Sequence, residues 1–93
     1  MTKDFKIGAK KIGGSNPTYV IAEIGFNHEG DIELGKKMIE AAASTGADAV
    51  KFQTYKASDL AFKNSPHYDL IRHGELGFQD HIELKKIADE NGV

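Results

Sequence analysis

One helix-like segment lies between two strand-like segments, and this order constrains the fold of the chain more than any other feature. Residues 31–45 place apolar side chains on one broad face and charged side chains on the opposite arc, with Asp31 as N-cap and Gly46 after the last turn. Residues 18–25 are apolar on both faces, which is typical of a strand buried on both sides, and residues 48–54 alternate. A further helix over residues 80–91, with Asp80 and Glu83 as a capping pair, completes a βαβα pattern and predicts a parallel sheet.

The rest of the chain fits around this unit as one small α/β domain. Residues 5–12 predict a short hairpin, residues 13–17 a loop, and residues 55–77 an irregular segment with one helical turn over 67–72. A (β/α)₈ TIM barrel takes about 250 residues. We therefore expect 93 residues to form the N-terminal portion of such a barrel, a fragment of a larger enzyme. Residues 18–93 supply its first βα units, and residues 1–14 hold the hairpin.

Composition excludes several classes of function. Lys plus Arg number 12 against 14 Asp plus Glu, a net charge of −2, so binding of nucleic acid through a basic field is not expected. The sequence has no stretch apolar and long enough to cross a membrane and no signal peptide at its start. It has no cysteine, which suits a cytoplasmic protein without disulfides or thiolate metal sites.

Candidate site residues follow from the rule that function collects at the carboxyl ends of parallel strands. That rule selects Glu23, Asn27, His28, Lys51, Gln53 and Thr54. Glu23 is a carboxylate near the end of a strand expected to be buried, where it costs free energy unless it is paired. It is either a catalytic carboxylate or a partner of metal-bound water, and the alternative is a structural ion pair with Lys51.

Lys51 and Gln53 share one face of their strand, two residues apart. A lysine facing a confined cavity suits a phosphate or a carboxylate, with neutralisation of Glu23 as the simpler alternative. A Schiff-base lysine ranks below anion binding. Gln53 either orients reacting groups or fills the barrel interior.

The histidines favour structural over metal-binding interpretations. His28 lies in a polar loop between Gly25 and Gly30, where hydrogen bonds that stabilise the loop or cap the helix are favoured over a metal ligand. We expect the other three histidines, at positions 67, 73 and 81, to lie on the surface. The glycines form neither a dinucleotide fingerprint nor a P-loop.

Two motifs resemble a known family. Residues 19–31, YVIAEIGFNHEGD, followed by residues 46–54, GADAVKFQT, are similar to the N-terminal part of the sialic acid (N-acetylneuraminate) synthases. The likeness extends over nearly the whole chain. It implies a (β/α)₈ barrel whose N-terminal end the hairpin caps. It also implies condensation of phosphoenolpyruvate with an N-acyl amino sugar to give a nonulosonic acid and phosphate, in a homodimeric enzyme.

The resemblance also implies roles for the candidate residues. Glu23 and Gln53 would be catalytic, Lys51 would hold phosphoenolpyruvate, and Thr54 would lie among the substrate contacts. Asn27 and His28 would shape the site wall, and Asn64 is a candidate sugar contact. A divalent metal, Mn²⁺ or Mg²⁺, would activate the sugar aldehyde, and its two histidine ligands in the family have no counterpart in this chain.

Two alternatives stay open at the level of the sequence. One is another barrel aldolase that uses Lys51 as a Schiff base. The other is a non-catalytic module that associates with itself through an uncovered sheet edge. In either case we expect the 93 residues alone to lack synthase activity.

Overall fold

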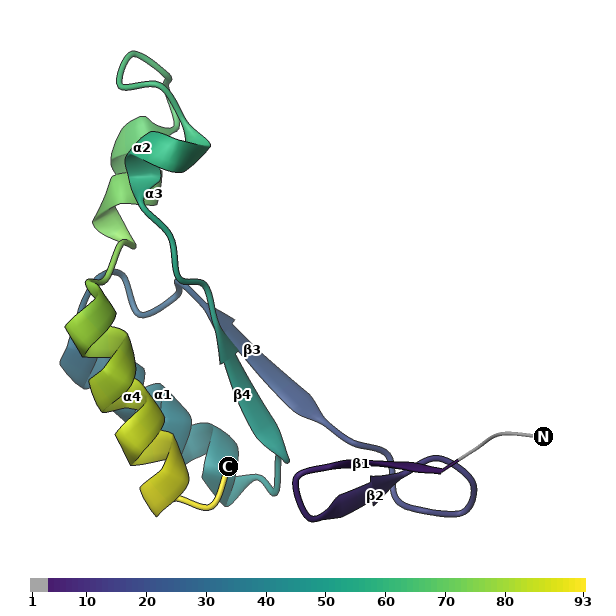
Figure 1. The fold of residues 1–93 in the computed structure, drawn as a ribbon. Coiled ribbons are helices and arrows are strands. Elements are labelled where there is room, and N and C mark those ends of the chain that lie inside the picture. The colour runs from purple at the N-terminus through teal and green to yellow at the C-terminus, as the bar shows by residue number, and fades with distance from the viewer. Residues whose placement is uncertain (1–3) are drawn as a thin grey trace.

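The computed structural model describes residues 4–93, which form two small sheets and four helices (Figure 1). Their order along the chain is β1 (Phe5–Ile7), β2 (Lys10–Ile12), β3 (Ile21–Gly25), α1 (Ile32–Ser44), β4 (Ala49–Phe52), α2 (Ala57–Leu60), α3 (Tyr68–His73) and α4 (Phe78–Glu90). The predicted hairpin is confirmed as the antiparallel pair β1–β2. Residues 1–3 of the predicted 1–14 segment lie outside the described residues.

The βαβα unit is confirmed, because β3 and β4 pair in parallel with α1 between them. Helices α1 and α4 lie side by side on the same face of this sheet (Figure 1). The core between sheet and helices is apolar. It comprises Ile24, Ile39, Leu76, Leu84 and Ala88, with Val50 and Phe52 packed against it.

The prediction that β3 is buried on both faces is wrong for the part of the chain that the structure describes. Ile24 points into the core, whereas Ile21, on the opposite face, is 54% exposed. No element of residues 4–93 packs on this second side of the β3–β4 sheet, which we call the open face. Glu23, expected to be buried, is consequently half exposed there.

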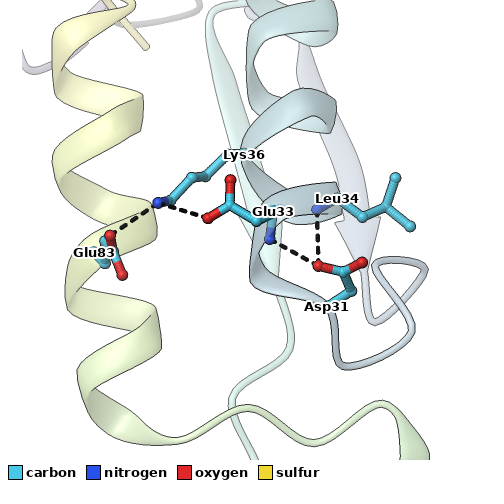
Figure 2. A network of polar contacts seen from close by, with 5 residues as sticks. All are labelled: Asp31, Glu33, Leu34, Lys36 and Glu83. Carbon is cyan, nitrogen blue, oxygen red and sulfur yellow. Dashed lines mark hydrogen bonds and ion pairs between the residues drawn. The ribbon is translucent and has the colours of Figure 1, made fainter.

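Helix α1 begins where the sequence predicts. The Asp31 carboxylate accepts hydrogen bonds from the backbone N–H groups of Glu33 and Leu34, at 2.9 and 3.3 Å (Figure 2). Two N–H groups that the first helical turn leaves without carbonyl partners are thereby satisfied. One face of the helix carries Ile39 into the core.

Helix α4 begins two residues earlier than predicted, at Phe78 rather than Asp80. Gly77 is the N-cap, and its N–H donates to the Asp80 carboxylate at 3.3 Å, so Asp80 lies inside the first turn. The predicted pairing of Asp80 with Glu83 as a capping box is therefore wrong.

Helices α1 and α4 approach closely because Gly35 has no side chain. A Cβ at this position would come within 3.1 Å of the Leu84 side chain. At the rim, the Lys36 ammonium bridges Glu33 on its own helix at 3.2 Å and Glu83 on α4 at 2.9 Å (Figure 2). The two helices thus have an apolar contact with a charged rim.

Asp48 ties the hairpin to the sheet. Its carboxylate pairs with Lys10 of β2 and accepts the backbone N–H of Val20 at 2.7 Å. Both contacts favour the ionised form, so the pKa of Asp48 is lowered, with the Lys10 hydrogen bond as the larger cause. Among the described residues, no helix is both long and apolar enough to cross a membrane.

Candidate functional site

Glu23 and Lys51 lie opposite each other in the register of the two parallel strands, on the open face. The Lys51 Nζ is 2.9 Å from a Glu23 carboxylate oxygen, and the two side chains are 62% and 50% exposed. An ion pair this exposed contributes between zero and about 1 kcal/mol to stability. Stability alone therefore does not account for a carboxylate and an ammonium at this place.

An irregularity in the ladder brings Gln53 to the same place. Glu23 pairs with Lys51 but Gly25 pairs with Phe52, so the strands shift register between Glu23 and Gly25. Gly25 has a φ of +59°, and a Cβ there would lie 3.4 Å from Glu23 Oε1 and 3.8 Å from Gln53 Cδ. The Glu23 and Gln53 side chains therefore both reach over Gly25. Such irregularities re-aim side chains next to active sites.

Thr54 turns the other way. Its Oγ1 lies 3.3 Å from Nδ1 of His81 on α4, so it faces the helix layer rather than the open face. The predicted alternation within residues 48–54 is confirmed in this respect. The role of Thr54 as a substrate contact stays a prediction.

The loop after β3 is stabilised by hydrogen bonds to the backbone of the loop itself and of the end of β3. Asn27 donates from its backbone N–H and from its side-chain amide to the Ile24 carbonyl, both at 3.0 Å, and Asn27 is exposed. His28 is completely buried, and its Nδ1 accepts the Gly30 N–H at 3.0 Å. The loop-stabilising interpretation of His28 thus has direct support in the geometry. The roles of Asn27 and His28 in the wall of the site stay predictions.

Asn64 is not brought to the other candidates. It belongs to the segment between α2 and α3. This segment runs on the far side of that helix pair from β3 and β4 (Figure 1). The pair is anchored at its other end. Tyr55 donates to the Ile71 carbonyl at 2.7 Å, and Glu75 accepts the Ala57 N–H at 2.6 Å. The Tyr55 pKa is raised, mainly by burial.

The residues of the chain that the structure describes do not form a metal site. No group of three or more His, Cys, Asp or Glu side chains within residues 4–93 is arranged to hold an ion. The donor set of residues 4–93 therefore does not fit the divalent metal that the resemblance implies.

His81 is the neighbour of the site that sequence reasoning missed. We expected it on the surface, but its Nε2 is buried and its ring packs edge-on against Phe52, with ring centroids 6.4 Å apart. The signal was present, because His81 lies three residues before Leu84 and seven before Ala88. It therefore extends the apolar stripe of α4 by one turn.

The arrangement defines a class of protein. A parallel βαβα unit with an acid, a cation and an amide together at the strand ends fits the first units of a (β/α)₈ barrel. Residues 38–93 match the NeuB family, and the chain belongs to this family. Its relatives include synthases of N-acetylneuraminate 9-phosphate, legionaminic acid and pseudaminic acid.

Two relatives and one solved structure illustrate the similarity. The chain is 38% identical over 100 residues to N,N'-diacetyllegionaminic acid synthase of Legionella pneumophila, covering 92% of this chain and 28% of that protein. It is 37% identical over 98 residues to human N-acetylneuraminate-9-phosphate synthase, covering 88% and 26%. The structure of sialic acid synthetase from Leptospira borgpetersenii, in complex with citrate, superposes with a TM-score of 0.91 at 35% identity, covering 100% and 33%. The chain thus spans between a quarter and a third of the length of these proteins.

Proposed function

We propose that this chain supplies one wall of the active site of a nonulosonic acid synthase. The synthase would condense phosphoenolpyruvate with an N-acyl amino sugar. In this reaction C3 of phosphoenolpyruvate bonds to the aldehyde carbon of the sugar, water adds at C2, and inorganic phosphate leaves. The observation that carries the proposal is that Glu23, Lys51 and Gln53 meet on one face at the carboxyl ends of paired strands.

The chemistry of each group suits one part of this reaction. The Lys51 ammonium is a compact positive charge, and phosphoenolpyruvate carries a phosphate and a carboxylate that such a charge binds. The Glu23 carboxylate lies 2.9 Å from Lys51 and would help to move protons at the sugar end, giving one to the aldehyde oxygen or taking one from water. The Gln53 amide can both donate and accept, which suits orientation of the reacting groups.

The complete protein would add what these residues do not provide. We propose that it is a cytoplasmic homodimer, that a divalent ion (Mn²⁺ or Mg²⁺) is held by residues other than those described here, and that residues 1–93 alone have no synthase activity. Further strands would cover the open face and exclude water from Glu23 and Lys51. Exclusion of water strengthens every electrostatic interaction at the site.

The test replaces Lys51 in the complete synthase that contains this chain. Lys51→Ala should raise the KM for phosphoenolpyruvate by about ten- to a hundredfold and leave the KM for the sugar nearly unchanged, because one charge-assisted hydrogen bond is lost. Lys51→Arg should recover part of the affinity. Lys37→Ala, on the exposed arc of α1, is the matched control and should leave both values unchanged.

Two results would contradict the proposal. One is an unaltered KM for phosphoenolpyruvate in Lys51→Ala. The other is a borohydride-reduced adduct on Lys51 after incubation with pyruvate, which would identify the Schiff-base aldolase instead.

A further inference from the structure

Three aromatic rings, of which His28 is buried and Phe52 and His81 are partly buried, form a cluster between the strand ends and α4. His28 from the loop after β3 and His81 from α4 both pack on Phe52 of β4, with ring centroids 6.0 and 6.4 Å away. We call these residues the His28–Phe52–His81 cluster. Phe52 directly precedes Gln53, so the cluster lies behind the strand-end site, on the helix side of the sheet.

Each histidine holds one strand-end segment through its Nδ1. The His28 Nδ1 accepts the Gly30 N–H at 3.0 Å, and the His81 Nδ1 lies 3.3 Å from the Thr54 hydroxyl. Since the Gly30 amide can only donate, the His28 Nδ1 must carry a lone pair, and the proton of the neutral ring is on Nε2. The His28 contact fixes the turn within its own loop, whereas the His81 contact attaches the end of β4 to α4.

The two contacts respond differently to a proton. A protonated His28 has N–H groups at both ring positions, so its Nδ1–H would face the Gly30 N–H, donor against donor. The Thr54 hydroxyl can accept as well as donate, so its contact with His81 survives protonation of that ring. Proton sensitivity is therefore concentrated in His28.

The surroundings disfavour a charge on either ring. Both Nε2 atoms are buried and have no hydrogen-bond partner among residues 4–93. Burial is the main cause that lowers the pKa of both histidines. The pKa of His28 is lowered further by His81, whereas Asp80 raises that of His81 as the smaller effect.

The other charged groups on the neighbouring elements have partners of their own or lie apart from the rings. They are Glu29 and Asp31 in the loop, Lys36 on α1, Lys51 on β4, Glu75 before α4, and Lys85 on α4. Asp31 caps α1, and Lys36 bridges Glu33 and Glu83 (Figure 2). Lys51 pairs with Glu23, Glu75 accepts the Ala57 N–H, and Lys85 pairs with Asp89. Glu29 is exposed. None of them is a carboxylate paired with an imidazolium at position 28.

We propose that His28 is a proton-sensitive positioning residue, whose neutral ring holds the loop after β3 in place and whose protonation releases it. The significance of that loop for catalysis rests on the proposed function, but the release itself does not. Below the pKa of His28 the Gly30 hydrogen bond is replaced by a repulsive contact. Because a charged ring without a partner is costly to keep buried, the loop between Gly25 and Asp31 then separates from the helix layer.

The test measures hydrogen exchange of the Gly30 amide in the full chain, as a protection factor corrected for the intrinsic effect of pH. Between about pH 7.5 and 5, the Gly30 protection factor should fall by about tenfold or more, and it should stay below that of the Ile39 amide in α1 at every pH. Ile39 reports global unfolding, so a lower protection factor at Gly30 identifies a local opening.

Two variants at position 28 separate the hydrogen bond from the bulk of the ring. His28→Asn places an amide oxygen near the position of Nδ1 and cannot be protonated in this range, so Gly30 should stay protected at every pH. His28→Gln places its amide near Nε2 and should leave Gly30 unprotected throughout. In the synthase, kcat should decrease at low pH, and in His28→Asn this decrease should move to another pH or disappear.

Several outcomes would overturn the proposal. They are constant Gly30 protection in the wild-type chain while His28 titrates, equal protection factors at Gly30 and Ile39, or equal behaviour of the two variants. These readouts do not depend on synthase activity, so an absence of that activity would count against the proposed function alone.

Discussion

Gly30 has no room for a side chain, and this fixes the course of the loop that precedes α1. Its φ is +75°, and a Cβ would come within 2.3 Å of the carbonyl oxygen of His73. Since the obstacle is backbone from the segment before α4, it cannot turn aside as a flexible side chain would. The loop after β3 and the end of α3 are therefore locked together at this glycine.

Gly30→Ala should lower the free energy of unfolding by at least about 2 kcal/mol more than Gly46→Ala. Gly46 is the matched control because its φ is +86° and nothing lies within 4 Å of its Cβ position. Its replacement costs only the backbone strain, about 1–2 kcal/mol. Urea denaturation of both variants measures the difference, and equal destabilisation would contradict the clash.

Glu23→Gln should separate function from stability. Because the Glu23–Lys51 pair is exposed, the free energy of unfolding should change by less than about 1 kcal/mol, whereas turnover of the complete synthase should fall by about a hundredfold. Asp89→Asn breaks the exposed Lys85–Asp89 pair on α4 and is the control that leaves turnover unchanged. A Glu23→Gln enzyme with normal turnover would make the pair merely structural.

The sequence was sufficient to predict which residues share the open face but not how they lie there. Alternation along residues 48–54 placed Lys51 and Gln53 together, since the period of a strand is two. The shift of register between Glu23 and Gly25 was not predictable, because it depends on pairing between segments distant in the chain. Burial of His81 was missed because a polar residue on a helix is usually assigned to water.

At the scale of elements, the sequence predicts the segments with a regular repeat of apolar residues, but it predicts the ends of these segments less accurately. Strand β3 begins at Ile21 rather than Thr18 because the Val20 N–H donates to the Asp48 side chain instead of a strand carbonyl. Helix α4 begins at Phe78, which is 73% exposed and so adds nothing to the apolar stripe that locates the helix. Helix α2 has four residues, too few for any period to appear.

Helix α1 depends on its cap. Asp31→Ala should lower the free energy of unfolding by about 1 kcal/mol, because two backbone N–H groups lose their acceptor. Asp31→Ser restores a capping oxygen and should recover most of the loss. Chemical denaturation monitored by circular dichroism checks both variants, and a neutral Asp31→Ala would show that solvent replaces the cap at no cost.

For the whole molecule, stability should decrease in mild acid. The pKa values of His28 and His81 are lowered in the folded chain, so the unfolded chain takes up protons at higher pH. The contribution of these two groups to the free energy of unfolding is complete above their pKa in the unfolded chain, about 6.5. It is lost as the pH falls through their lower pKa values in the folded chain. Because the pKa of Asp48 is lowered in the folded chain, its contribution to stability is lost separately, below about pH 4.

Urea unfolding at several values between about pH 7.5 and 5 measures this dependence. His81→Asn removes one of the two groups and should reduce the slope, whereas His67→Asn, at an exposed position, should leave it unchanged. A free energy of unfolding that is constant over this range would contradict the prediction.

The contact of Asp48 with Lys10 and Val20 sets an order of events during synthesis on the ribosome. The hairpin pairs residues only a few positions apart and can close early, and α1 can form as soon as its own residues have emerged. Strand β3 must wait for β4, since Val20 and Asp48 are 28 residues apart, and Lys10 must wait 38 residues for the same carboxylate. The emergence of Asp48, with β4 directly behind it, is thus the earliest point at which the hairpin, β3 and α1 can join, and the core is completed only when α4 follows.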